Sequence, residues 1–210
     1  MAETSYHHGD LHTAMIEKGI EMINKDGYGN LSLRKVAAAC GVSHAAPYSH
    51  FAGKEEFISA IQDHITEKLM HVLTTAVEES DDTMYGMLRM GCDYALFFAR
   101  NPQYYSFLIS RANIQVDFSE NSEGYEPFAY YKETMFKLFN EVGYPKELWL
   151  KTIITHWAFV HGLASIASIP GSGDIADWEE RIPDLIMNLY FLNPGKPFAN
   201  VEKLPEGGIT

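Results

Sequence analysis

Apolar side chains recur at helical spacing along almost the whole chain, and this periodicity constrains the fold more than any other feature. Near the N-terminus, apolar residues return at intervals of three and four positions, as in Met15, Ile16, Ile20 and Ile23. This spacing is typical of amphipathic helices, and no segment shows the strict alternation expected of a strand. The sequence therefore predicts an all-α protein of about nine helices, the first ending at Asp26 and the others covering residues 33–40, 43–50, 55–79, 83–100, 103–111, 127–142, 145–168 and 177–192. Pro183 lies inside the last range, so that helix either kinks there or begins near Arg181.

Two short helices joined by a tight turn are expected between Ser32 and His50. Ser32 is a natural N-cap for the first, and Gly41 supplies the left-handed backbone conformation that the turn requires. The second short helix is expected over residues 43–50, and Pro47 restricts its start to about Ser43 or His44, since proline is tolerated only in the first helical turn. This arrangement is a helix-turn-helix.

The same part of the chain contains an acid-free window. The chain carries 28 acidic residues and a formal net charge of -12, yet residues 27–54 include Arg34, Lys35 and Lys54 and no Asp or Glu. At the average density, about four acids would fall there. The gap is either chance in a short window or a surface that faces phosphates. The overall acidity argues against a protein that coats nucleic acid broadly, but it permits one local DNA-reading face.

The stretch from Gly9 to Phe57 resembles the N-terminal domain of the TetR-like (tetracycline-repressor-like) transcriptional regulators. Its signature, Tyr-x-His-Phe-x-x-Lys-x-x-apolar, reads here as Tyr48, His50, Phe51, Lys54 and Phe57. Further along, "HWAFVHGLASI" resembles a Trp-His-Gly motif of one TetR subclass, with Trp157, His161 and Gly162.

The resemblance implies a DNA-binding regulator, and specifically a repressor released from a pseudo-palindromic operator by a small-molecule effector. It implies an N-terminal three-helix helix-turn-helix domain over residues 1–53 and a C-terminal helical domain over 54–192 that binds ligand and dimerises. Proline, glycine and polar residues predict an extended tail over 193–210. Effector binding would change the separation of the two recognition helices of a homodimer. The last two long helices carry apolar residues on more than one face, which favours them as the dimer interface.

The DNA-binding residues are expected in and around the acid-free window. Ser43 and Tyr48 offer hydroxyls to phosphates, and Lys54 stands at a helix N-terminus, where the dipole also favours an anion. Small side chains near the bases can touch thymine methyl groups but form no bidentate contacts. The expected set is Arg34, Lys35, Ser43, His44, Ala45, Ala46, Tyr48, His50 and Lys54.

Aromatic residues crowd the C-terminal part and suggest a site for a small apolar or aromatic effector. The alternative is plain core packing, in which His161 is a satisfied core histidine and Gly162 a close helix crossing. A charged effector is disfavoured because the expected walls carry few cations. The expected ligand-binding residues are Tyr94, Phe97, Phe98, Tyr131, Met135, Trp157 and His161.

Other kinds of site receive little support from the sequence. His8 and His12 have a metal-compatible spacing, but no further ligand completes a set, and a solvated arm near DNA is favoured. Cys40 and Cys92 fit reduced thiols. No catalytic motif or cofactor site is recognised, and the absence of a long apolar run or leader favours a cytoplasmic protein. The alternatives are an all-α ligand-binding protein or enzyme without DNA function, and an architectural DNA protein without a ligand.

Overall fold

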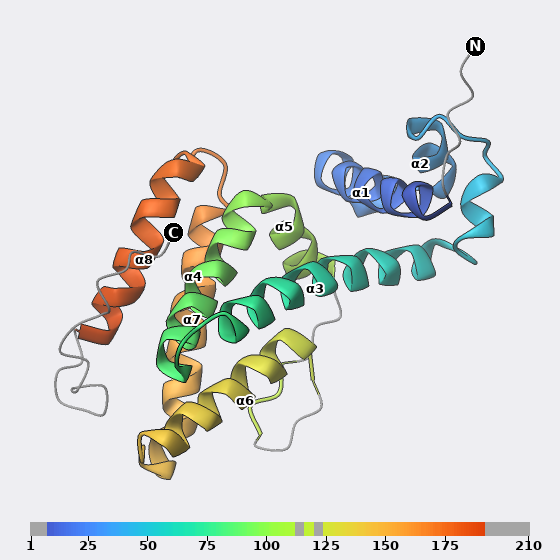
Figure 1. The fold of residues 1–210 in the computed structure, drawn as a ribbon. Helices are drawn as coiled ribbons and strands as arrows, with labels where there is room; N and C mark the ends of the chain where they lie inside the picture. Colours follow the sequence, from blue (N-terminus) through green and yellow to red (C-terminus); the bar gives the residue numbers. More distant parts are fainter. Residues whose placement is uncertain (1–7, 112–115, 120–123, 192–210) are drawn as a thin grey trace. The chain divides into compact units, whose positions relative to one another are not determined.

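The computed structural model describes residues 8–111, 116–119 and 124–191, and within these ranges all regular structure is helical (Figure 1). The all-α prediction is therefore confirmed. The predicted tail, 193–210, lies outside the described residues. The α-helices are α1 (His8–Asp26), α2 (Leu33–Ala39), α3 (Lys54–Glu78), α4 (Thr83–Arg100), α5 (Pro102–Arg111), α6 (Glu126–Glu141), α7 (Trp149–Ala167) and α8 (Ile175–Phe191), and three short 3-10 helices are η1 (Tyr28–Asn30), η2 (Ala46–Ser49) and η3 (Lys146–Leu148).

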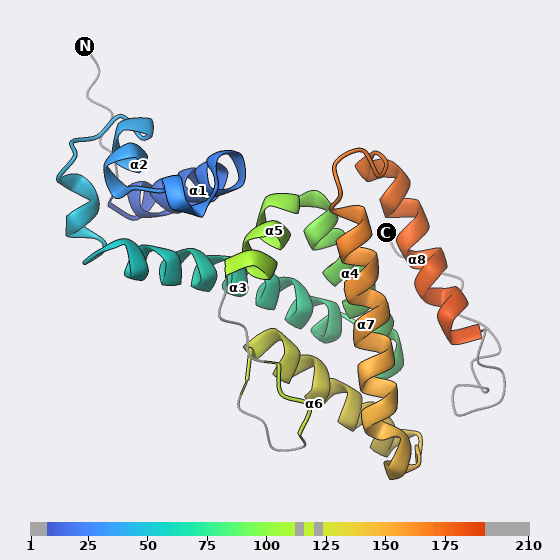
Figure 2. The ribbon, with the colours of Figure 1, turned by 180° about the vertical axis from the view of Figure 1, so that it is seen from behind.

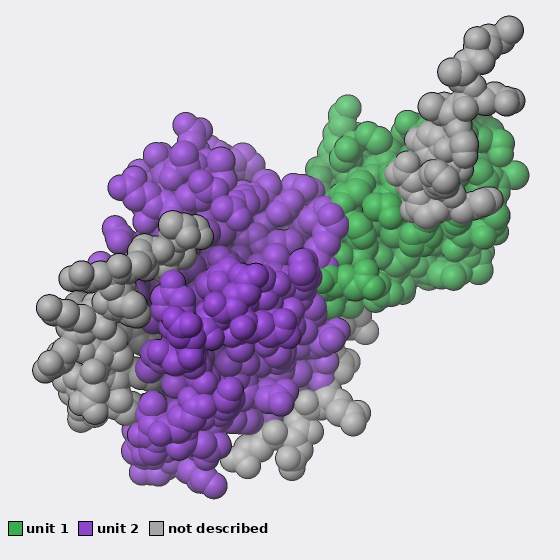
Figure 3. Space-filling model, in the orientation of Figure 1, with its two compact units in different colours: residues 1–67, 106–112 green, residues 68–105, 113–210 purple. Residues whose placement is uncertain are grey.

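The chain divides into two compact units (Figure 3). Unit 1 takes its described residues from 1–67 and 106–112, and unit 2 takes them from 68–105 and 113–210. Helices α3 and α5 each begin in one unit and end in the other. The functional division at residue 53 that the resemblance implied stays a prediction.

Unit 1 is built on the packing of α1 against the first part of α3. Met15, Ile20, Phe57 and Ile61 are fully buried in its core. The two helices approach closely at Gly19, where an added Cβ would lie 2.5 Å from the Phe57 ring. A residue larger than glycine would have to push this ring aside, so Gly19 fixes the distance between the helices.

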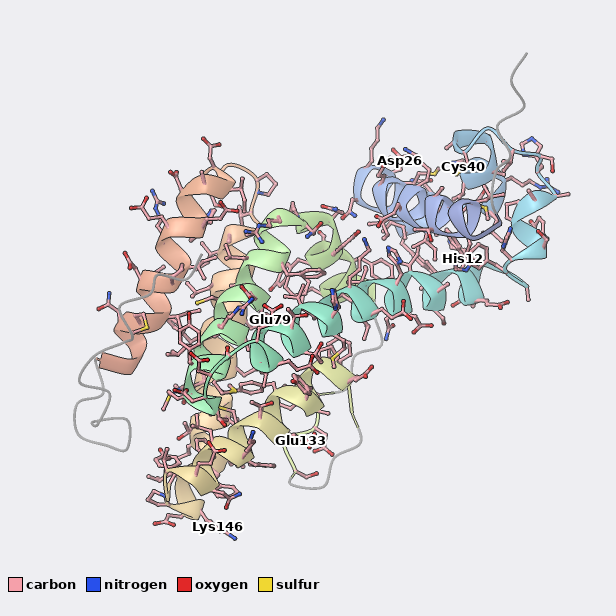
Figure 4. The ribbon with its side chains drawn as sticks, in the orientation of Figure 1. His12, Asp26, Cys40, Glu79, Glu133 and Lys146 are labelled. Carbon is pink, nitrogen blue, oxygen red and sulfur yellow. The ribbon has the colours of Figure 1, made fainter. Side chains whose placement is uncertain are left out.

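The first helix and the turn of the helix-turn-helix form as the local signals predict. The Ser32 hydroxyl accepts a hydrogen bond from the Lys35 amide at 3.2 Å, which caps α2. Gly41 has a φ of 71°, a left-handed conformation that other residues adopt only with strain. The chain then reverses, and the Val42 amide donates to the Ala37 carbonyl at 3.0 Å. Cys40 lies at the end of α2 (Figure 4), half-buried beside the Ala14 carbonyl.

The short helix expected over residues 43–50 differs from the structure. Only Ala46–Ser49 is helical, and it is the 3-10 helix η2. Pro47 explains the difference, because it has no amide hydrogen to donate to residue 43. The neighbouring amides bond three residues back instead, Ala46 to Ser43 at 3.0 Å and Tyr48 to Ala45 at 3.1 Å.

Unit 2 is organised around α4, which packs against α6, α7 and α8 (Figures 1 and 2). Its buried face includes Cys92 and Phe98, and the facing helices contribute Met135, Ala164 and Ile186 to the same core. None of the helices in the described part of the chain combines the length and apolar character needed to cross a bilayer.

The last helix begins earlier than predicted and runs through its proline. Helix α8 is continuous from Ile175 to Phe191 with Pro183 inside it, so a start near Arg181 is wrong. Proline costs such a helix one backbone hydrogen bond. Burial of Trp178, Ile182 and Ile186 on one face offsets this loss.

Candidate functional site

The nine predicted DNA-binding residues all lie in unit 1, and most of them are exposed. Arg34 and Lys35 project from α2, and Tyr48 on η2 keeps 54% of its surface accessible. Arg34, Lys35, Ser43, His44, Ala45 and Tyr48 are exposed, and Ala46, His50 and Lys54 are half-buried. The set therefore offers hydroxyls, imidazoles and cations. The sequence between Arg34 and Lys54 contains no Asp or Glu.

Two buried side chains hold helix η2 against the core of unit 1. Pro47 is buried, and Phe51 is 2% exposed with its ring 4.8 Å from that of Phe57. The amides of His50 and Phe51 both donate to the Pro47 carbonyl, at 3.0 and 2.9 Å. With these residues turned inward, Tyr48 is left facing solvent.

Lys54 has partners within unit 1 as well as a position suited to an anion. Its Nζ donates to the Tyr28 carbonyl at 3.0 Å and lies 4.1 Å from the centre of the Tyr28 ring. The Tyr28 hydroxyl in turn donates to Glu55 Oε1 at 3.3 Å. Lys54 is the first residue of α3, so its ammonium adds to the positive end of the helix dipole. Removal of this side chain would affect both charge and local packing.

His12 (Figure 4) is part of the helical module, because α1 begins at His8. Its ring centre lies 4.9 Å from that of Phe51 and 5.8 Å from that of His50. The solvated arm predicted to include His8 and His12 is therefore wrong for His12, which packs on the same cluster that supports η2. Within the described ranges, no group of three or more His, Cys, Asp or Glu residues is arranged to hold a metal.

Comparison with known proteins assigns this module. Residues 15–61 match the family model "Bacterial regulatory proteins, tetR family". The N-terminal module therefore resembles that of tetR-family regulators. This match covers the helix-turn-helix and the beginning of α3, which include all nine predicted DNA-binding residues. The matched model describes regulatory proteins.

A curated relative and several solved structures extend the comparison. The HTH-type transcriptional regulatory protein RaaS of Mycobacterium tuberculosis is 32% identical over 74 residues, which are 35% of this chain and 34% of the relative. The chain thus aligns with only about a third of that protein's length. A transcriptional regulator (TerR/AcrR family) from Aquifex aeolicus VF5 has a TM-score of 0.64 at 15% identity over 85% of this chain and 99% of its own.

Two further solved structures share the fold of this chain. The TetR family transcriptional regulator PfmR from Thermus thermophilus has a TM-score of 0.61 at 18% identity, with 83% of this chain and 97% of PfmR covered. A protein of unknown function from Rhodococcus sp. RHA1 has a TM-score of 0.64 at 21% identity over 89% of this chain and 98% of its own. At these identities the similarity concerns the fold, and it includes the C-terminal helices as well as the tetR-type module.

In unit 2, two of the predicted ligand residues contact the imidazole of His161, and a third packs on one of these two. The Tyr94 hydroxyl lies 2.9 Å from His161 Nδ1. The Trp157 indole stacks on the His161 ring with 4.9 Å between centres and 16° between planes. Phe98 packs edge-on against Tyr94 at 5.0 Å. The i, i+4 spacing on α7 thus produces a real contact between Trp157 and His161.

The other predicted ligand residues have more ordinary positions. Met135 is fully buried and Phe97 is 8% exposed, as expected for core side chains. Tyr131 donates from its hydroxyl to the Ile153 carbonyl at 3.0 Å. For Gly162, an added Cβ would meet nothing within 4 Å in the described chain, so a close helix crossing within one chain does not explain this glycine.

Sequence reasoning missed two residues of the same cluster and a buried lysine elsewhere in unit 2. Tyr105 on α5 places its hydroxyl 3.4 Å from His161 Nε2, and Phe118 packs edge-on against Trp157 at 5.9 Å between centres. Lys132 is only 4% exposed and donates from Nζ to the carbonyls of Asp117 at 3.1 Å and Ser119 at 2.6 Å. The abundance of aromatic residues was a signal for Tyr105, but a lysine on an amphipathic helix gives no sign that it will be buried.

Burial sets the protonation states in unit 2. It lowers the pKa of His161 and raises the pKa of Tyr94, so both are neutral near pH 7. Burial also lowers the pKa of His156 to about 4 and raises the pKa of the Cys92 thiol to about 12. The centre of unit 2 therefore offers hydrogen bonds without a charge on these groups.

Proposed function

We propose that this chain is a DNA-binding transcriptional regulator that acts as a homodimeric repressor and leaves its operator when a small apolar or aromatic effector binds. The observation that carries the proposal is the tetR-type module over residues 15–61, whose turn region is exposed and free of acidic residues. Double-stranded DNA carries about one negative charge per 1.7 Å of axis, so a carboxylate in this region would be repelled.

The residues of the turn region suit backbone contacts better than base readout. Tyr48 and Ser43 are exposed hydroxyls, and Arg34 is an exposed cation. Alanines at positions 45 and 46 leave few side chains able to discriminate bases. Specificity would then depend on two copies of the module, on His44 and on the shape of the DNA.

An exposed apolar stripe on α7 supports the homodimer. Its large members are Leu150 at 48% exposure, Ile154 at 39% and Ile166 at 51%, with Ala158 and Gly162 between them. Small residues flanked by large apolar ones allow two helices to approach closely, and an exposed stripe of this kind marks an interaction surface. Ile153, Ile182 and Ile186, by contrast, are buried in the chain's own core. Helix α7 can therefore pair with a second copy without unfolding that core.

The cluster around His161 supports a ligand site in unit 2. Tyr94, Trp157 and His161 are half-buried, a combination of contact and accessibility that suits residues lining a binding site. The competing interpretation is an all-α ligand-binding protein without DNA function, which would keep this cluster but would not use the turn region.

A gel-shift titration distinguishes the two functions. The full chain is titrated against the DNA upstream of its own coding region and against a scrambled duplex of equal length, in a series of salt concentrations. We expect a specific complex with the upstream DNA that weakens steeply with salt. Equal affinity for both duplexes, or no complex at low salt, would contradict the proposed function and leave the ligand-binding protein as the better account.

A further inference from the structure

The imidazole of His161 lies between two phenols. Its Nδ1 is 2.9 Å from the Tyr94 hydroxyl and its Nε2 is 3.4 Å from the Tyr105 hydroxyl. The three groups come from α4, α5 and α7, so the helices of unit 2 bring together a phenol–imidazole–phenol chain. A neutral imidazole donates from one nitrogen and accepts at the other. The three side chains together can therefore donate or accept one hydrogen bond at either phenol.

The two hydrogen bonds of the His161 imidazole differ in length. The Tyr94 bond has the length of a good hydrogen bond, whereas 3.4 Å to Tyr105 is at the limit of one. A ligand oxygen placed near His161 Nε2 and the Tyr105 hydroxyl could form shorter bonds than these groups form with each other. The free energy lost by parting Tyr105 from His161 would be small, and the ligand would recover it.

The aromatic rings around the His161 imidazole present flat faces. Trp157 lies parallel to the His161 ring, within 16°. Phe98 turns its ring edge-on to both tyrosines, at 5.0 Å from Tyr94 and 5.4 Å from Tyr105. Tyr105, Trp157 and His161 each keep part of their surface accessible. Aromatic faces held in this way favour a planar ring over a flexible aliphatic chain.

Three cations of unit 2 are engaged by other groups. Arg89 donates to Glu79 at 2.9 Å, and Arg100 donates to Glu179 at 2.7 Å. The buried ammonium of Lys132 donates to two backbone carbonyls. A carboxylate entering the cluster would lose its hydration without gaining a ready counter-charge, which is costly in a buried site.

We propose that the effector is an uncharged planar ring compound that carries a hydroxyl or carbonyl oxygen, and that Tyr105 and His161 recognise this oxygen. The inference deepens the proposed function, since it assumes that this cluster is the effector site. It names the class of ligand and the two residues that distinguish this class from apolar and anionic rings.

Three probes that share one ring system test the inference on the full chain without DNA. Naphthalene lacks a polar atom, 2-naphthol carries a neutral hydroxyl, and 2-naphthoate carries a negative charge. Dissociation constants at pH 7.5 are measured by calorimetry and by tryptophan fluorescence. We expect 2-naphthol to bind roughly three- to tenfold more tightly than naphthalene, and at least about tenfold more tightly than 2-naphthoate. Tighter binding of 2-naphthoate, or no saturable binding of 2-naphthol, would overturn the proposal.

Two variants assign the recognition to the named residues. Tyr105→Phe and His161→Phe keep a ring in place, and each should remove most of the preference for 2-naphthol over naphthalene. Tyr144→Phe is the matched control, because the Tyr144 hydroxyl bonds to Thr152 Oγ1 at 2.7 Å, outside the His161 cluster. A preference that survives both test variants, or that Tyr144→Phe removes equally, would refute the assignment even if 2-naphthol binds.

Gel shifts with each probe separate the failure of this inference from that of the proposed function. If 2-naphthol binds with the expected preference but never changes DNA affinity, the ligand class is supported and effector-controlled release fails. If 2-naphthoate alone releases the DNA, release is supported and the uncharged ligand class is overturned.

Discussion

Tyr94 on α4 and His161 on α7 are joined by a hydrogen bond of 2.9 Å between the phenol and Nδ1 of the imidazole. Sixty-seven positions separate the two residues in the sequence, and α4 and α7 are two of the helices that pack together in unit 2. The bond therefore ties the centre of the unit together and holds the imidazole of the proposed effector site in place.

Loss of this hydrogen bond should lower stability. Tyr94→Phe should reduce the free energy of unfolding by about 1 kcal/mol, since His161 Nδ1 loses its partner in a half-buried site. A double-mutant cycle with His161→Phe, measured by urea unfolding, should give a coupling of about 0.5–1.5 kcal/mol. Tyr48→Phe is the control, because Tyr48 is 54% exposed and its change should stay within about 0.5 kcal/mol. Additive effects of the two substitutions at 94 and 161 would contradict the coupling.

Acid should destabilise the fold through His156. Because burial lowers its folded pKa to about 4 from 6.5, the unfolded state binds the proton first as pH falls below 6.5. The stabilisation is therefore complete above that pH and is lost progressively down to about pH 4, by up to about 3 kcal/mol. Urea unfolding of wild type and His156→Gln between pH 7.5 and 4.5 checks this. The variant should lose less stability than wild type over this range, and parallel curves would argue against His156 as the titrating group.

Substitution of the turn glycine should strain the helix-turn-helix. Gly41→Ala forces a side chain into a backbone with φ of 71°, at a cost of about 1–2 kcal/mol. An added Cβ meets no atom within 4 Å at Gly41 or at Gly29, and of these two glycines Gly41 alone has a left-handed φ. Thermal unfolding should thus show a loss for Gly41→Ala and little change for Gly29→Ala. Equal effects of the two would mean that conformation at residue 41 does not limit stability.

The apolar stripe on α7 should hold two subunits together. Ile166→Glu places a charge on a residue that is 51% exposed in the single chain, and burial of that charge in an interface is unfavourable. Sedimentation equilibrium at micromolar concentration should show a dimer for wild type and a shift towards monomer for the variant. Ile109→Glu changes an equally exposed isoleucine of α5, at 58%, and should remain dimeric. A wild-type monomer at that concentration would refute the homodimer.

The charge of Lys54 should contribute to DNA binding independently of sequence. Lys54→Met keeps an unbranched side chain beside the Tyr28 ring and removes the ammonium. We expect weaker binding to specific and scrambled duplexes alike, with the slope of log affinity against log salt reduced by about one per subunit. Lys151→Met, at an exposed lysine of unit 2, should leave the slope unchanged. An unchanged slope for Lys54→Met would leave Lys54 with only its structural bond to Tyr28.

Local features of this fold were predictable because the determinants lie close together in sequence. Gly27 and Gly41 end helices, Ser32 caps one, and the i, i+4 spacing of Trp157 and His161 produces a stack on one helix face. Pro47 also acts locally, and the missing amide was enough to turn the expected α-helix into η2.

Tertiary features were not predictable from the same patterns. Tyr105 reaches His161 across 56 positions, and Lys132 is buried because the carbonyls of Asp117 and Ser119 accept its hydrogens. Neither contact has a periodic signature, since it depends on how α5, α6 and α7 are placed around α4. The composition predicted an aromatic effector site, but the polar centre of the proposed site arises only from packing.

The placement of the two cysteines has a consequence for redox chemistry. Burial raises the pKa of Cys40, and it raises that of Cys92 to about 12. A thiol with a pKa near 12 is deprotonated in roughly one molecule in a hundred thousand at pH 7, and the thiolate is the form that peroxides and alkylating agents attack. Oxidants and electrophiles should therefore react slowly at Cys92, which leaves this core thiol poorly suited to sensing oxidative stress and well suited to surviving it.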